Sequence, residues 1–185
     1  MTMVLQAGQQ EDELVAAANG ACPACGGDLM RWGAARTRLV REAGADRRIR
    51  PSRVRCRACG VTHVVLPPEV LVRRRDAAAA VGRAWQLYVD GLGARSAARE
   101  LDVPMETVRG WLRRLRSLAR SSEGSRAGAD RDRMRVVLAR LIAAARRHGA
   151  RDMTDVWRFA SHRSQGALLT NTNWLSGLAA TSPMS

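Results

Sequence analysis

The sequence predicts a small α+β protein, with a β-rich module first and an all-α unit after it. Three observations predict this order. Four cysteines lie in two similar pairs within the first third of the chain, short apolar and β-branched runs surround them, and apolar residues after the double proline 67–68 recur at helical spacing. A chain of 185 residues can hold two to three such small modules.

The two cysteine pairs share the pattern Cys-x-x-Cys-Gly and contain every cysteine of the chain. They are Cys22 with Cys25, and Cys56 with Cys59. In such a turn the two-residue spacer lets both thiolates reach one ion, and the glycine behind them accepts a left-handed backbone conformation. Two turns supply four sulfur ligands, which predicts one structural zinc ion, Zn2+, in a tetrahedral site. Because four thiolates leave no position for water, this zinc is expected to hold shape and not to hydrolyse a substrate.

Two other uses of paired cysteines fit the sequence less well. A redox dithiol is disfavoured because nothing nearby resembles the βαβ context of a thioredoxin-type site. Secreted disulfides are disfavoured because residues 1–20 are acidic and lack the long apolar run of a signal peptide. We therefore expect a metal site in a reducing cytoplasm. His63 follows the second pair, and with four thiolates present we expect it at the surface or behind the ligands.

Residues 21–67 are predicted to form the zinc ribbon. The stretch 29–40 can supply one or two strands, and a further strand runs through 49–55 into the second cysteine pair. Residues 61–66 contain enough β-branched side chains for the return strand, which the double proline ends.

Two segments of this first part are expected to lack strands. Residues 42–48 contain Gly44 and Asp46 and are predicted to form a loop. Residues 1–20 are expected to be a flexible leader, with at most a short helix over 11–18.

Residues 69–120 are predicted to form a three-helix unit. The first helix lies within 69–90, and glycines on both sides of Leu92 end it. Residues 94–113 then resemble a helix-turn-helix, in which two steeply crossing helices need a small residue at their contact and apolar residues on both sides of the turn. The residues in these positions are Ala98, Leu101, Val103, Val108, Trp111, Leu112, Leu115 and Leu118. Trp85 and Trp111 are expected in the core of the unit.

The turn itself departs slightly from the usual motif. Asp102 stands where glycine is common, and aspartate adopts the left-handed conformation at modest cost. Pro104 suits the start of the following helix.

The face opposite the apolar one is the part of a recognition helix that enters the major groove. The residues expected to contact DNA there and on the preceding helix are Arg95, Arg99, Met105, Glu106, Arg109, Gly110, Arg113 and Arg114. Arg109 and Arg113 are predicted to contact bases or phosphates, whereas Arg95 and Arg99 are predicted to contact backbone phosphates. The alternative is a helical hairpin inside a larger domain, with the arginines as a solvated face.

The C-terminal third begins with a predicted linker, 121–130, which is rich in serine, glycine and alanine. Residues 131–185 are predicted to form a helical segment and tail. Over 131–148 apolar residues recur at helical spacing and predict an amphipathic helix, whose stripe must cover the helix-turn-helix core or the same stripe of a second copy. A short helix is expected over 152–161. The isolated His148 and His162 are expected at the surface.

The charge of the chain favours a polyanionic partner. The net charge is +14, and all 31 basic residues are arginine. Such a field attracts nucleic acid first, and the planar guanidinium suits phosphate oxygens and guanine edges. Aromatic residues are sparse, at 4%, so stacking on single-stranded bases is less favoured than contact with double-stranded DNA. No apolar stretch approaches the length of a membrane span.

Several short strings carry a resemblance to a known group of proteins. They are the two cysteine turns, the second of which runs into 62–67, together with Arg31-Trp32-Gly33 and the stretches 107–113 and 168–174. With them the chain resembles actinobacterial proteins of unassigned function that join a four-cysteine zinc ribbon to a helix-turn-helix. Such proteins are often encoded beside transposase or integrase genes. The resemblance implies DNA binding in a mobile-element or regulatory setting and supplies no activity.

The sequence thus predicts a non-enzymatic, zinc-stabilised, sequence-specific DNA-binding protein. It would be cytoplasmic and nucleoid-associated, and would act as a transcriptional regulator or as the DNA-recognition partner of a transposase. A transposase, an integrase or a second copy are the possible protein partners.

Two alternatives stay open. One is an interaction module whose ribbon docks on RNA polymerase or a transposase. The other is a transposase or nuclease that binds magnesium through carboxylates. The enzyme is disfavoured because the acidic residues are few and scattered, and Asp152 and Asp155 are better explained as a helix start.

Overall fold

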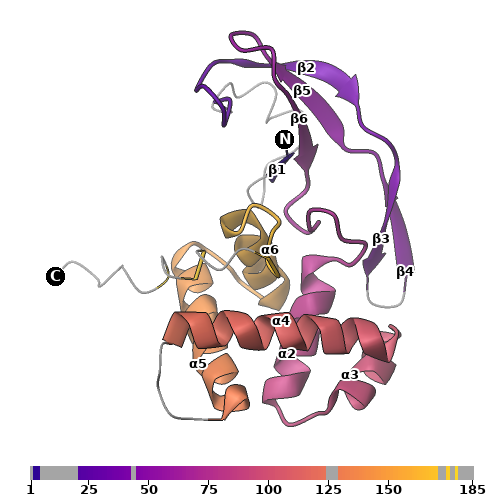
Figure 1. Cartoon of the computed structure of the whole chain (residues 1–185), viewed down its shortest axis with the longest axis vertical. Helices are drawn as coiled ribbons and strands as arrows, with labels where there is room; N and C mark the ends of the chain where they lie inside the picture. Colours follow the sequence, from indigo (N-terminus) through magenta and orange to yellow (C-terminus); the bar gives the residue numbers. More distant parts are fainter. Residues whose placement is uncertain are drawn as a thin grey trace, which may run out of the picture.

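The computed structural model of the chain describes residues 2–4, 21–42, 45–123, 129–170, 174–175 and 178. Strands gather at one end of the molecule and helices at the other (Figure 1). The strands are β1 (Thr2–Val4), β2 (Leu29–Ala34), β3 (Arg38–Glu42), β4 (Ala45–Ile49), β5 (Ser52–Cys56) and β6 (Thr62–Leu66). The helices are α2 (Ala78–Val89), α3 (Ala94–Leu101), α4 (Met105–Glu123), α5 (Asp130–Arg147) and α6 (Met153–Arg163). The predicted α+β class, with strands before helices, is confirmed.

Four strands form one sheet, in the order β1-β6-β5-β2. β5 runs antiparallel to both β2 and β6, and β1 runs parallel to β6. In the β2–β5 register Leu29 lies opposite Cys56. Because Leu29 follows the first cysteine turn and Cys56 begins the second, this pairing brings the two turns together.

The predicted loop over 42–48 is wrong at Glu42, which ends β3, and over 45–48. Ala45–Ile49 forms β4, which pairs with β3 in a separate two-stranded hairpin. Its register places Arg38 opposite Ile49 and Glu42 opposite Ala45. This strand forms by pairing with β3, and the polar residues of the stretch itself did not indicate it. Gly44 lies outside the described residues.

The leader contains a strand that the sequence analysis did not anticipate. Thr2 pairs with Val64 and Val4 with Leu66, so β1 adds an edge to the sheet. The possible short helix over 11–18 falls outside the described residues.

The first helix begins later than the segment 69–90 suggested. α2 starts at Ala78, because the preceding residues pair with the ribbon and with each other instead of coiling. Bridges join Arg41 to Asp76 and Val70 to Ala77. Val70 and Ala77 are buried in a small apolar cluster that also contains residues of both ribbon sheets, Val40, Ile49 and Leu66.

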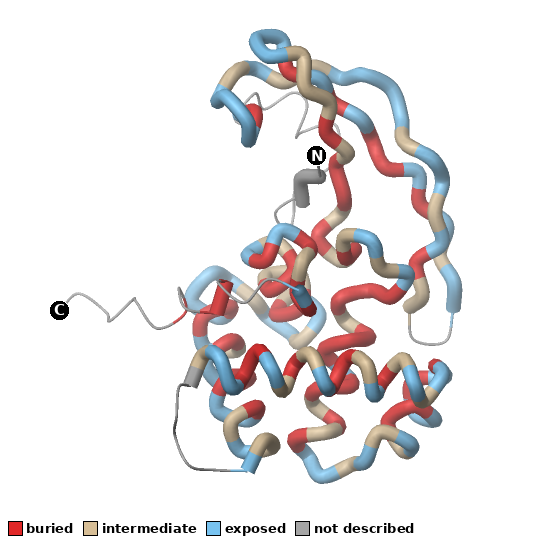
Figure 2. Tube along the Cα trace, in the orientation of Figure 1, coloured by how far each residue is buried: buried red, intermediate tan, exposed pale blue. Residues whose placement is uncertain are grey.

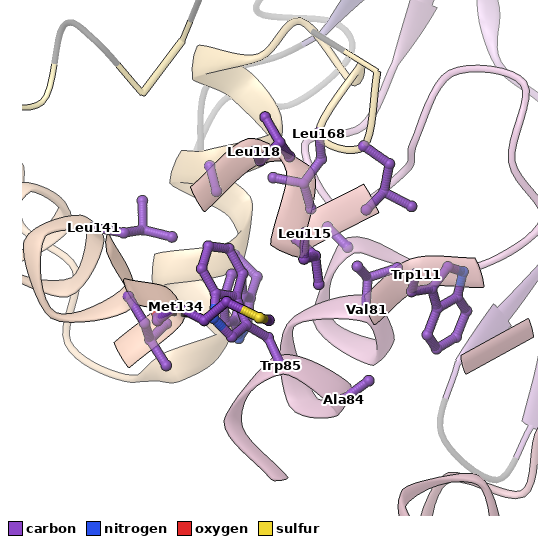
Figure 3. Packing of buried hydrophobic residues seen from close by; sticks show 14 of the residues in the cluster. Val81, Ala84, Trp85, Trp111, Leu115, Leu118, Met134, Leu141 and Leu168 are labelled. Carbon is purple, nitrogen blue, oxygen red and sulfur yellow. Dashed lines mark hydrogen bonds between the residues drawn. The ribbon is translucent and has the colours of Figure 1, made fainter. Parts of the chain in front are cut away.

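A second, larger apolar cluster joins the five described helices. Figure 3 shows Trp85 of α2 lying beside Met134 of α5, and the Trp85 indole Nε1 donates a hydrogen bond to the Met134 carbonyl at 3.1 Å. The ring of Trp157 from α6 lies 5.9 Å from that of Trp85. The apolar stripe of α5 therefore covers the core formed by the earlier helices. All eight apolar positions predicted for residues 98–118, and both tryptophans, are buried.

The end of α4 also differs from the predicted boundary. This helix continues to Glu123, three residues into the predicted linker 121–130. Residues 124–128 are not described. The short helix expected over 152–161 is confirmed as α6, whose N-cap Asp152 accepts a hydrogen bond from the backbone N–H of Asp155. Buried segments concentrate between the helices, whereas much of the outer ribbon is exposed (Figure 2).

Gly82 in α2 permits the contact between α2 and α6. A Cβ added at this position would lie 1.9 Å from a ring carbon of Trp157. We expect Gly82→Ala to lower the free energy of unfolding by about 1–3 kcal/mol, because the buried ring must shift. Urea denaturation followed by circular dichroism measures the change.

The matched control is Gly110→Ala in α4, where the added Cβ meets only the end of the Arg114 side chain at 3.4 Å. This variant is expected to gain about 0.5–1 kcal/mol from helix propensity. Equal effects of the two substitutions would contradict the packing role of Gly82.

Candidate metal centre and basic surface

The four cysteines converge on one point. All four sulfur atoms lie within 4.8 Å of one another. Cys22 Sγ is 3.7 Å from Cys59 Sγ, and Cys25 Sγ is 3.5 Å from Cys56 Sγ. Each of these two contacts therefore joins a sulfur of the first cysteine turn to a sulfur of the second.

The two turns have the same backbone geometry. Gly26 donates its N–H to the Cys22 carbonyl at 2.7 Å, and Gly60 donates to the Cys56 carbonyl at 3.1 Å. Both glycines have a positive φ, +75° and +72°. This is the left-handed conformation that the repeated Cys-x-x-Cys-Gly pattern predicted.

The sulfur positions fit a closed tetrahedral metal site. A tetrahedron with metal–sulfur bonds of about 2.3 Å has sulfur–sulfur edges of about 3.8 Å, close to the 3.7 and 3.5 Å of these two contacts. Cys22 and Cys56 are buried, whereas Cys25 and Cys59 are exposed. The predicted ligand set is therefore brought together in full, and it is compatible with a metal ion.

The thiols of this group do not ionise independently. The backbone N–H of Cys59 donates to Cys56 Sγ and lowers the pKa of Cys56 to about 6. The pKa of Cys59 is raised to about 12: the Val61 amide lowers it, but hydrogen bonds with the Cys25 thiol and with the other two sulfurs, together with desolvation, outweigh that effect. A cation is needed to hold all four sulfurs as thiolates, so metal binding here releases protons.

His63 lies directly behind the first cysteine. It is fully buried on β6, and its Nε2 is 3.3 Å from Cys22 Sγ. Burial lowers the pKa of this imidazole, which favours the neutral ring. A neutral ring that carries its proton on Nε2 donates to the sulfur. Of the two expected places for His63, the surface is wrong and the position behind the ligands is confirmed.

The connection between α3 and α4 has the predicted backbone geometry. Asp102 adopts the left-handed conformation, with φ 50° and ψ 49°. Val103 donates its N–H to the Ala98 carbonyl at 3.1 Å, which closes the turn, and the Pro104 carbonyl accepts from Thr107 at the start of α4. The α3–α4 turn is thus a tight one, and its apolar residue Val103 is buried.

Most of the residues expected to contact DNA are exposed on α3 and α4. The exposed ones are Arg95, Arg99, Glu106, Arg109 and Arg113. Glu106 forms an ion pair with Arg109 at 2.8 Å.

The other three are half-buried. Met105 packs against the helical core, so its side chain is less available than expected. Arg114 Nη1 donates to the carbonyl of Gly110 at 3.3 Å, so the Arg114 side chain lies back along α4.

A cluster of arginines at this surface includes one that the sequence analysis did not assign. The pKa of Arg114 is lowered by burial and by repulsion from Arg74 and Arg113. Arg74 belongs to the segment before α2, so it lies close to α4 only in the folded chain. None of the three pairs with a carboxylate among the described residues. No local sequence pattern indicates this cluster.

The two histidines expected at the surface differ in exposure. His148 is exposed and stacks on Phe159, with ring centroids 5.2 Å apart, whereas His162 is half-buried. None of the described helices is both long enough and apolar enough to cross a membrane.

A domain of unknown function, DUF6431, covers residues 22–111. The matched region begins at the first metal-site cysteine, includes the second pair and the α3–α4 turn, and ends in α4. No curated protein and no solved structure matches the chain. The domain match assigns no activity and indicates no source organism or neighbouring gene.

The contact between His63 and Cys22 generates a prediction about metal affinity. We expect His63→Phe to bind Co2+ about 10- to 100-fold more weakly than the unchanged chain, because the sulfur loses a hydrogen-bond donor while a flat aromatic ring still fills the position. Thiolate-to-cobalt absorption in competition with a chelator measures the affinity. His148→Phe is the matched control and should leave it unchanged. Unaltered affinity in a folded His63→Phe variant would show that this contact does not tune the site.

Proposed function

We propose that the chain is a zinc-stabilised protein that binds double-stranded DNA in a sequence-specific manner. The observation that carries the proposal is the exposed basic face of α4, where the charges of Arg74 and Arg113 repel that of Arg114 and neither Arg113 nor Arg114 forms an ion pair with a described carboxylate. Such uncompensated charge favours a polyanionic ligand. The phosphates of a duplex offset the repulsion and supply acceptors for each guanidinium.

The α3–α4 pair supports a helix-turn-helix assignment. The tight turn at Asp102 leads into α4, one face of which exposes Glu106, Arg109 and Arg113. The ion pair holds the Arg109 guanidinium in position, so less side-chain entropy is lost when it meets a base. Arginine binds the O6 and N7 atoms of guanine, and glutamate accepts from the cytosine amino group. We assign the recognition of base edges to these three side chains.

Zinc is the metal that best suits the four cysteines. Four soft thiolates in tetrahedral separation select zinc or an iron centre, and zinc is the ion of closed structural sites that make no use of redox change. We assign Cys22, Cys25, Cys56 and Cys59 as its ligands. In this role the ion stabilises the ribbon, and the protein acts as a transcriptional regulator or as the DNA-recognition partner of a transposase.

Removal of the metal should unfold the ribbon and leave the helices. The ribbon depends on the thiolate site, whereas the helices share a separate apolar core. We expect about one equivalent of zinc per chain. A chelator should unfold the ribbon strands while the helical circular dichroism signal persists. Metal analysis and amide hydrogen exchange measure the two quantities. A chain that keeps its ribbon protected without any metal would contradict the assignment.

Substitutions should divide the proposed DNA contacts into base contacts and phosphate contacts. Arg109→Ala and Arg113→Ala should each weaken binding to the preferred duplex by about 1–3 kcal/mol and relax its sequence preference, because a base contact is lost. Arg95→Ala should weaken preferred and scrambled duplexes equally, because it removes a phosphate contact. Gel-shift titrations on a duplex selected from a random pool measure both effects.

Arg146→Ala removes the same charge from the exposed end of α5 and serves as the control, with little effect expected on either duplex. Equal losses from Arg109→Ala and Arg146→Ala would contradict the recognition role of α4. Failure of the zinc-loaded chain to bind any duplex would overturn the proposed function and favour an interaction module.

A further inference from the structure

An exposed tryptophan lies on the ribbon, far along the chain from α3 and α4. Trp32 of β2 has 49% of its surface exposed, the largest value among the described large apolar residues that are exposed. Met30 pairs with Arg55 across β2 and β5, so these two side chains share a face of the sheet with Trp32. The helical core cannot explain the position of Trp32, because this residue belongs to neither apolar cluster.

Arg55 is held in place over this ring. Its guanidinium carbon lies 4.8 Å from the centroid of the Trp32 ring, and its Nε donates to the Gly60 carbonyl at 3.2 Å. A guanidinium stacked on an indole forms a flat surface that is both aromatic and cationic. Because Gly60 belongs to the second cysteine turn, Arg55 is hydrogen-bonded to the turn that carries Cys56 and Cys59.

A depression of about 250 Å³ lies beside this pair. Its lining residues are Met30, Trp32, Arg55, Cys56, Arg57 and Gly60. Arg55 and Arg57 line it and are exposed, and neither of them pairs with a carboxylate among the described residues. The depression therefore combines a stacking surface with uncompensated positive charge, and it is comparable in size to a single nucleotide.

We propose that this depression binds an unpaired nucleotide of a nucleic acid strand. The base lies against the Trp32–Arg55 surface, and the guanidinium of Arg57 contacts its phosphate. A paired base is covered by its neighbours in the stack and cannot lie flat on an aromatic ring, so the site selects single-stranded nucleic acid. Flat base surfaces, apolar contact and negative phosphate are each matched by a group that lines the depression.

This site goes beyond the proposed duplex binding, because its ligand is an unpaired strand and its residues lie on the ribbon. The sparse aromatic content of the sequence argued against base stacking in general. One exposed tryptophan that is already stacked by an arginine is sufficient for a single nucleotide.

The test compares two ligands with the zinc-loaded full chain: a short fluorescent oligothymidine, which forms no duplex with itself, and a blunt-ended duplex. Trp32→Ala removes the stacking surface without changing the charge. We expect it to weaken oligothymidine binding about 5- to 100-fold and to change duplex binding less than about 2-fold. Fluorescence anisotropy titrations measure both affinities. Leu39→Ala, at an exposed apolar position of β3 with 40% exposure, is the matched control and should change neither.

Each outcome decides the inference separately from the proposed function. Oligothymidine that binds normally to a folded Trp32→Ala variant, or that does not bind the unchanged chain, overturns the nucleotide site while duplex binding stands. Equal losses for both ligands also overturn it, because the site would then not select unpaired strands. Arg109→Ala should show the opposite pattern, weakening the duplex more than the oligothymidine. Loss of duplex binding alone in the unchanged chain would defeat the proposed function and leave this site supported.

Discussion

The ribbon depends on one constraint, the convergence of four thiols that the β2–β5 register brings together. Leu29 opposite Cys56 places the end of one cysteine turn beside the start of the other, and the sulfurs then lie within 4.8 Å. Four thiolates this close repel one another unless a cation lies between them. The convergence of the four cysteines thus supplies a long-range link within the ribbon, beside the small apolar cluster that joins Val40, Ile49 and Leu66. The position of Arg55 over Trp32 is linked to the second turn, because Gly60 of that turn accepts the Arg55 hydrogen bond.

The ribbon and the helices meet through the segment that follows the double proline. Arg38 of β3 donates to the carbonyls of Leu71 and Arg74, at 3.4 and 2.6 Å, and Arg41 pairs with Asp76 at 3.5 Å. Burial raises the pKa of Asp76, and the nearby Arg41 opposes this effect. Loss of either charge would leave the other in a poorly solvated place, which makes this pair costly to break. The same segment carries Arg74 to the surface of α4, so the hairpin β3–β4 helps to arrange the basic cluster.

Features that depend on neighbours in sequence could be predicted, and features that depend on distant partners could not. The cysteine turns, the left-handed Asp102 and the apolar face of α4 each follow from a few adjacent residues, whose spacing or conformational preference is sufficient. The strand β4 depends on a register with β3, and the start of α2 depends on pairing with the ribbon. Likewise the approach of Arg74 to Arg114 joins positions forty residues apart in a chain where every basic residue is arginine. No property of Arg74 alone distinguishes it from the other arginines.

In the two proposals, the positive charge of the chain has a different role at each end. At the helical end Arg74 and Arg113 repel the charge of Arg114, and in the proposed function the phosphates of a duplex offset this repulsion. At the ribbon end Arg55 is stacked on an indole beside a depression, which suits a base that has left its partner. The hairpin contacts join the ribbon to the segment before α2, and under both proposals a ligand that engages both ends contains paired and unpaired segments. Uniform duplex would leave the Trp32 surface exposed to water, and a uniform single strand would leave the α4 side chains without a groove to read.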